Sequence, residues 1–269
     1  MIGELALYLG FGGVAGVLSG LLGIGGGVVI VPFLVWHFSL RGFPANAVMI
    51  MAVATSLATI VVTSLSAASA HHRRGAVDWW AVKKLAPGIL LGAVLGSMVA
   101  DRLPAREFKL IFAGFLLYAA SHILLKPPRE RHREDAPDYR WFGGAGTVIG
   151  ALSSILGIGG GTLSVPFLAR RGYPLRTAVA ISSACGFPIA VAGTATYIGL
   201  GWHNAALPAW SCGYLYLPAL AGITLTSVSL APFGAYLAHR WPTGRLRICL
   251  ALIIALAGGK LLWQALPVI

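Results

Sequence analysis

Apolar residues fill long blocks along the chain, and polar residues are confined to the short stretches between them. The blocks cover residues 2–22, 26–38, 45–69, 85–100, 108–125, 141–156, 160–169, 175–200, 213–238 and 246–266. Runs such as 110–125 lack the two-residue alternation of polar and apolar positions that a membrane β-barrel needs. The pattern therefore predicts an all-α polytopic membrane protein.

The pattern of blocks occurs twice, in two repeats joined by a charged linker. Residues 126–140, KPPRERHREDAPDYR, form the linker between a first repeat at 1–125 and a second repeat at 141–269. The sequence GLLGIGGGVVIVPFL at 20–34 matches SILGIGGGTLSVPFL at 154–168 at 10 of 15 positions. Chance similarity of apolar stretches is the alternative, but it does not account for GIGGG and VPFL in both copies. Such an internal duplication is typical of secondary transporters.

Two of the blocks are too short to cross a bilayer. As a helix, block 26–38 would be about 20 Å long against a hydrocarbon core of about 30 Å, and block 160–169 is shorter still. We therefore expect broken helical hairpins at 2–38 and 141–169, each entering and leaving on one side. Three transmembrane helices follow each hairpin, so the second repeat is expected to be inverted relative to the first. If each hairpin instead crosses the membrane twice, the helices that follow it keep the same orientation, so this alternative stays open.

The basic residues are distributed unevenly under this topology. With two returning hairpins, five Lys and Arg residues fall on one side of the membrane and fifteen on the other, as the positive-inside rule requires. The count places the linker 126–140 and the loop 71–84 in the cytoplasm and both termini outside, in a multi-pass protein of the cell inner (plasma) membrane. The same rule accounts for the net charge of +12, so we expect the lipid bilayer and no nucleic acid as a partner.

Composition narrows the classes of function. Charged residues make up 10% of the chain, against about 25% in soluble domains, which excludes a soluble enzyme. The three cysteines have no CxxC spacing, and no cofactor motif is present, so no metal, cofactor or catalytic residue is expected. An intramembrane enzyme is the weakest alternative, because its GxSG or HExxH signature is missing. The sequence leaves open whether two copies form a homodimer.

The duplicated GIGGG segments are the first candidate site. Glycines destabilise a continuous helix by about 1 kcal/mol each, and unwound backbone inside a membrane is tolerated only where it is buried or lines a cavity. A half-helix that starts there points free N–H groups at the cavity, which suits an anion. The alternative is that the glycines only allow close helix crossing. The substrate-binding prediction covers Gly25, Gly26, Gly27, Gly159, Gly160 and Gly161, with Pro32 and Pro166 setting the bend of the half-helices.

Small hydroxyl side chains form a second group of candidates. Hydroxyls donate to an oxyanion without the desolvation cost of a buried lysine. In membrane helices, however, Ser and Thr often bond to the carbonyl of their own helix one turn earlier. The predicted substrate-binding residues of this kind follow the two hairpins or the second glycine segment: Thr55, Ser56, Thr162, Ser182 and Ser183.

These motifs resemble a known family. The duplicated GIGGG and VPFL, together with RGFP at 41–44 and AVATS at 52–56, resemble the sulfite exporter TauE/SafE family, also called the toluene-sulfonate uptake permease family. GAVDWW at 75–80 and GYLYLP at 213–218 fit it too, so the resemblance covers essentially the whole chain. The second repeat departs from the first at Cys185-Gly186, where the first has Thr55-Ser56.

The resemblance implies a secondary transporter of a small sulfur-containing anion, of the sulfite or organosulfonate class. The residues themselves imply an anion held at glycine breaks near the middle of the membrane. A passive anion channel is the nearest alternative, because two repeats around a central site suit either function.

Overall fold

The computed structural model describes residues 2–22, 26–125, 141–238 and 243–265. The predicted linker 126–140 lies outside these residues. The first half of the chain contributes α1 (Ile2–Leu22), α2 (Gly27–Leu40), α3 (Val48–Arg73), α4 (Trp79–Arg102) and α5 (Ala105–Leu125). The second half contributes α6 (Phe142–Leu156), α7 (Gly161–Arg170), α8 (Leu175–Gly201), β1 (Ser211–Cys212), β2 (Leu215–Tyr216), α9 (Leu217–Ala238) and α10 (Thr243–Ala265).

The helices follow the apolar blocks, with two differences. Helix α4 starts at Trp79 rather than near residue 85, because the Asp78 carboxylate accepts hydrogen bonds from the backbone N–H groups of Trp80 and Ala81 and caps the helix. The predicted loop 71–84 is therefore helical at both ends. The second difference is the small antiparallel sheet of β1 and β2, which precedes α9 where the pattern predicted a continuous apolar segment.

Apolar side chains cover much of the outer surface. Leu225 and Leu256 expose 66% and 74% of their surface, and α4 exposes a stripe that includes Leu91. Such a surface is unfavourable in water but suits contact with lipid. Three described helices, α3, α4 and α8, are long and apolar enough to cross a bilayer. The chain is an all-α membrane protein, as predicted.

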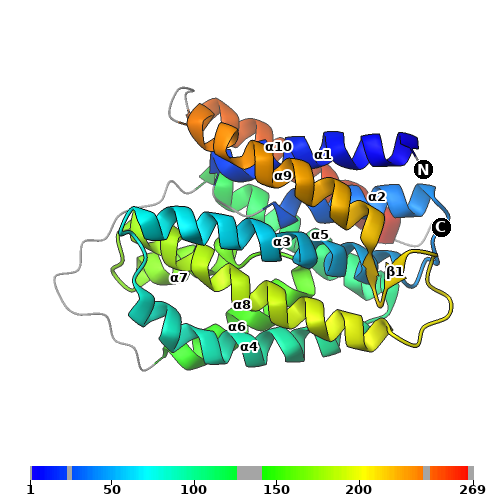
Figure 1. The fold of residues 1–269 in the computed structure, drawn as a ribbon, viewed down its shortest axis with the longest axis horizontal. Helices are drawn as coiled ribbons and strands as arrows, with labels where there is room; N and C mark the ends of the chain where they lie inside the picture. Colours follow the sequence, from blue (N-terminus) through cyan, green and yellow to red (C-terminus); the bar gives the residue numbers. More distant parts are fainter. Residues whose placement is uncertain (1, 23–25, 126–140, 239–242, 266–269) are drawn as a thin grey trace.

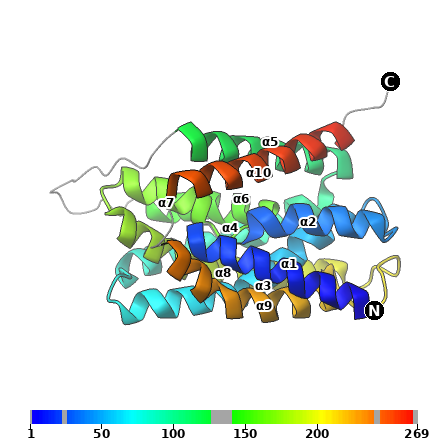
Figure 2. The same cartoon turned by 90° about the horizontal axis from the view of Figure 1, so that it is seen from above.

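Helices from one half of the chain pack against helices from the other half in a reciprocal pattern. Helix α1 lies along α9, and α6 lies along α4, so the first helix of each half packs against the fourth helix of the other. Helices α3 and α8 pack together in the interior, where α3 also meets α2 and α9. Helices α5 and α10 form a peripheral pair, as Figure 2 shows.

Each glycine segment joins two antiparallel helices in a hairpin. In Figure 1 the start of α1 and the end of α10 lie at one end of the long axis, α1 runs inward from that end, and α2 returns to it. Helices α6 and α7 form a hairpin that begins at the opposite end, where the turns from α3 to α4 and from α7 to α8 also lie. With 14 and 10 residues, α2 and α7 are about 21 and 15 Å long, shorter than a hydrocarbon core of about 30 Å.

Glycines allow α4 and α6 to approach backbone to backbone. A Cβ atom added to Gly88, Gly92 or Gly96 would collide with the α6 carbonyl oxygens of Gly143, Thr147 or Ala151. From the other side, Gly146 and Gly150 face α4 in the same way. Small residues at this spacing let van der Waals packing hold helices together in lipid.

We expect Gly92→Leu to destabilise the protein, because its side chain has no space against the backbone of α6. The expected loss is about 1–3 kcal/mol, the usual cost of overpacking, measured as a lower unfolding midpoint in detergent. Gly114→Leu is the matched control, since no neighbouring atom lies within 4 Å of a Cβ at that exposed position of α5. An equal loss in both variants would contradict this account of the α4–α6 contact.

Candidate functional site

The two glycine segments meet in the interior of the protein. Gly27 begins α2, and a Cβ atom added there would collide with the carbonyl oxygen of Gly157 and approach Ile158. The same Gly157 oxygen accepts a hydrogen bond of 2.8 Å from the buried Ser56 hydroxyl of α3. Two predicted residues of the first repeat, Gly27 and Ser56, therefore meet the second glycine segment at Gly157, where α6 ends.

The second glycine segment contains two residues with left-handed backbone. Gly157 ends α6 with φ 65°, and Gly160 precedes α7 with φ 78°, a region that glycine enters at little cost. The turn is closed by hydrogen bonds from Ile158 N to Ser153 O at 3.0 Å and from Ser164 N to Gly160 O at 2.7 Å. No side chain caps α7, so its first N–H groups remain available as donors.

Two serine hydroxyls flank this second break. Ser153 of α6 and Ser164 of α7 are both fully buried, and neither hydroxyl has a hydrogen-bond partner. A Cβ atom on Gly160 would lie 3.7 Å from the Ser153 Oγ and 3.2 Å from the Ser164 Oγ. A buried hydroxyl without a partner costs about 1–3 kcal/mol. Two of them beside free helix N–H groups indicate a place where a polar ligand supplies the missing partner.

Two predicted residues lie on the helices that form this region. The hydroxyls of Thr162 on α7 and Ser182 on α8 are buried and also have no hydrogen-bond partner. Ser182 is two helical turns before Ile189, whose Cδ1 atom approaches Gly160, so both lie on the same face of α8. Helix α8 thus brings a further hydroxyl to the face that covers the break.

The site is polar but carries no buried charge. Among the described residues, the buried polar side chains are hydroxyls and His37, and no Lys, Arg, Asp or Glu is buried. No group of His, Cys, Asp and Glu in the described chain could hold a metal ion. The available donors are therefore neutral hydroxyls and the N-terminal N–H groups of α7, which together favour an anion.

The first glycine segment has different surroundings. Its predicted residue Gly25 lies outside the described residues. Gly26 has ordinary helical φ of −58°, and the nearest atom to an added Cβ is the Ile30 Cδ1 at 3.0 Å. Val28 and Ile30 stand where the second copy has Thr162 and Ser164. The two breaks are related in sequence, but only the second is surrounded by hydroxyls among the described residues.

Other predicted residues have partners elsewhere. The Thr55 Oγ1 accepts a 3.1 Å hydrogen bond from the Tyr216 backbone N–H, which ties α3 to β2. Ser183 donates to the Val179 carbonyl of its own helix at 2.9 Å. A Cβ on Gly159 would approach Ile60. Gly161 begins α7, while Pro32 and Pro166 lie inside α2 and α7.

The predicted substrate-binding residues do not include Ser153, or Ser164, which follows the second glycine segment two positions after Thr162. Their spacing carries a usable signal, because Ser153 lies four residues before Gly157 and Ser164 four residues after Gly160. One helical turn on either side of a break places a side chain beside it.

Helix α4 is tied to the second half of the chain at both ends. At one end the Tyr173 hydroxyl donates to the Asp78 carboxylate at 3.1 Å, and at the other the Tyr214 hydroxyl donates to the Asp101 carboxylate at 2.8 Å. Burial and the adjacent Asp101 raise the pKa of Tyr214, so this phenol stays protonated and keeps its donor role at neutral pH. The bonds tie α4 to the turn between α7 and α8 at one end and to the turn between β1 and β2 at the other.

Comparisons with known proteins give a consistent result. The family model described as sulfite exporter TauE/SafE matches residues 8–261. A "probable membrane transporter protein" of Haemophilus influenzae is 38% identical over 252 residues, covering 93% of this chain and 95% of the relative. A similarly named protein of Methanocaldococcus jannaschii is 26% identical, covering 94% and 93%. Another, from Bacillus subtilis, is 26% identical and covers 94% and 95%. No solved structure matches significantly.

Alanine substitution should lower the stability of the protein more at the second glycine segment than at the first. Gly160→Ala forces a Cβ into left-handed backbone close to Ile189, at an expected cost of about 1–2 kcal/mol in unfolding free energy. Gly26→Ala meets only the end of the Ile30 side chain, so its effect should stay within about 0.5 kcal/mol. Chemical unfolding of both variants in the same detergent measures the difference. Equal losses would show that the two glycine segments are equally constrained.

Proposed function

The chain belongs to the sulfite exporter TauE/SafE family, and we propose that it is a secondary transporter of a small sulfur-containing anion of the sulfite or organosulfonate class. The family and the names of the relatives make it a membrane transporter. The single observation that carries the anion site is the pair of buried, unpartnered hydroxyls of Ser153 and Ser164 beside the second glycine break, and the sulfur class follows the description of the family.

A sulfur oxyanion suits these donors chemically. Its oxygens are hydrogen-bond acceptors pointing in several directions, and the second break offers N–H groups of α7 and hydroxyls from α6 and α7. Each such contact to a charged group is stronger than a neutral hydrogen bond. Because no lysine or arginine is buried in the described chain, the anion would be held without an ion pair, which favours release on either side.

The proposed transport cycle uses an inverted repeat. Support comes from the hairpins that begin at opposite ends of the molecule (Figure 1) and from the exchanged pairing of α1 with α9 and α4 with α6. In such proteins, movement of one repeat unit against the other exposes a central site alternately to the two sides. The contact of Gly27 with Gly157 lies where the two hairpins would move against each other.

Removing the hydroxyls should weaken anion binding without weakening the fold. We expect Ser153→Ala with Ser164→Ala to lower sulfite affinity at least tenfold, because a hydrogen bond to a charged group contributes about 1.5–3 kcal/mol. Stability should stay the same or rise, since two unpartnered buried hydroxyls are lost. Binding to purified protein is measured by calorimetry with sulfite, an organosulfonate, sulfate and acetate.

Ser183→Ala is the control for this experiment, because its hydroxyl already bonds to Val179 of its own helix. Unchanged sulfite affinity in the double variant would remove the second break as the site. Preference for acetate would contradict the substrate class. Counterflow by preloaded anion in proteoliposomes tests the carrier mechanism, because a passive channel shows none.

The proposed orientation in the inner membrane places the linker 126–140 in the cytoplasm and both termini outside. In a variant without native cysteines, Asp135→Cys should be protected from an impermeant thiol reagent in intact cells, while Asn204→Cys should react. Asn204 lies in the exposed turn between α8 and β1, and Figure 1 shows this turn at the end of the molecule where α1 begins. The reverse labelling pattern would invert the proposed orientation.

A further inference from the structure

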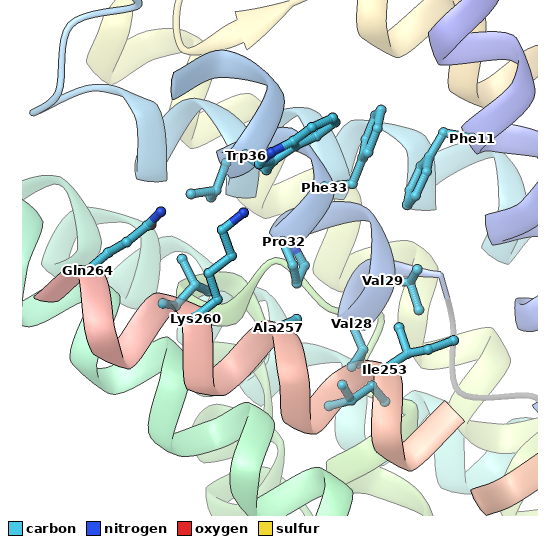
Figure 3. Close-up of a pocket in the computed structure, with 13 residues that line it drawn as sticks. Phe11, Val28, Val29, Pro32, Phe33, Trp36, Ile253, Ala257, Lys260 and Gln264 are labelled. Carbon is cyan, nitrogen blue, oxygen red and sulfur yellow. The ribbon is translucent and has the colours of Figure 1, made fainter. Parts of the chain in front are cut away.

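A groove lies between α2 and α10, apart from the hydroxyls of the second glycine break. It encloses a cavity of about 280 Å³, and Figure 3 shows its two walls. Val28, Pro32 and Phe33 line it from α2, and Ile253 and Ala257 line it from α10. No hydroxyl side chain lines the cavity, so it does not share the donors of the proposed anion site.

The groove follows from how α10 packs. On one face, α10 lies close to α5, where a Cβ added to Gly258 would be 3.0 Å from the Leu116 Cβ. Its groove-lining residues Ile253, Ala257, Lys260 and Gln264 recur every three or four positions and form one stripe. This stripe faces α2 without filling the space between the two helices.

The groove is apolar along its length and basic at one end. Figure 3 shows Lys260 and Gln264 extending from α10 toward the Trp36 end of α2, while Phe11 and Ile253 lie toward the other end. The Lys260 Nζ lies 5.9 Å from the centre of the Trp36 ring. In the described part of the chain, Lys260 makes no salt bridge, so its charge is available to a ligand.

We propose that this groove binds an acyl chain of an acidic phospholipid, whose phosphate contacts Lys260 and Gln264. From Ile253 to Gln264 the stripe rises about 16 Å along α10, a length that suits a hydrocarbon chain lying along the helix. The cavity is slightly smaller than the usual ligand pocket of about 300–1,000 Å³, which suits one chain. Ile253, which lines the groove, is exposed on α10, so the groove is reached directly from the bilayer.

The lipid would act as a filler between two parts of the protein. Helix α2 is the half-helix that begins at the first glycine break, whereas α10 belongs to the peripheral pair with α5. Without an occupant, the apolar walls contributed by Val28 and Ala257 face empty space and lose their dispersion contacts. An acidic lipid is thus expected to stabilise the first hairpin against α10.

The test compares lipids on the purified, full-length protein. Native mass spectrometry with phosphatidylglycerol and phosphatidylcholine of equal chain length should show tighter binding of phosphatidylglycerol. Lys260→Gln should weaken phosphatidylglycerol binding about fivefold, in line with the attraction of one lysine for acidic lipid, and leave phosphatidylcholine unchanged. Lys109→Gln, on α5 near the same end of the molecule, is the charge control and should have no effect.

A second pair of variants tests the groove itself. Ala257→Phe should fill the cavity and reduce binding of both lipids, whereas Leu256→Phe, on the exposed face of the same helix, should not. Equal binding of the two lipids by the unmodified protein, or unchanged binding in Lys260→Gln, would overturn the proposal. Displacement of the lipid by an alkylsulfonate that is also transported would likewise overturn it, since the groove would then be part of the substrate route. If Ala257→Phe does not fold, the exposed Lys260 decides the result.

Discussion

Inside a bilayer, a backbone N–H or carbonyl group has no water to bind and must find a partner in the protein. The two glycine segments interrupt helices in this environment, so the rest of the structure has to supply those partners. It does so by placing the breaks against each other: the carbonyl of Gly157 touches Gly27 and accepts the Ser56 hydroxyl. The central helices α3 and α8 and the paired hairpins are arranged around this contact.

Close packing makes this arrangement possible without a hydrophobic driving force between helices. Glycines on α4 and α6 bring the backbones together, and Gly12 and Gly16 do the same where α1 meets α9. Van der Waals contact then replaces the hydrophobic effect that holds soluble bundles. The Asp78–Tyr173 and Asp101–Tyr214 bonds add polar attachments at the two ends of α4. Within the described residues, no Lys, Arg, Asp or Glu is buried.

The sequence predicted the helices well because lipid imposes long apolar blocks, and the duplicated glycine segments located the breaks. It missed the start of α4, where the Asp78 cap extends the helix through the polar pair Lys83-Lys84. It also missed β1 and β2, since two-residue strands have no periodicity to detect. The sequence could not predict the roles of individual hydroxyls, because their partners are distant in the chain. Thr55 bonds to Tyr216, 161 positions away. Only the folded chain shows that Ser153 and Ser164 are unpartnered. The two GIGGG segments are identical in sequence, although the side chains that surround their described residues in the fold differ.

The absence of buried Lys and Arg from the described chain has an electrical consequence. The proposed anion site is built from neutral donors and does not cancel the charge of its ligand, so an anion that crosses through this site alone would carry its charge through the membrane field. A potential of 100 mV, negative inside, shifts the equilibrium of one elementary charge by about 2.3 kcal/mol, about fiftyfold in concentration. For a monovalent anion moving without a coupling ion, the voltage of an energised cell would drive the cycle outward.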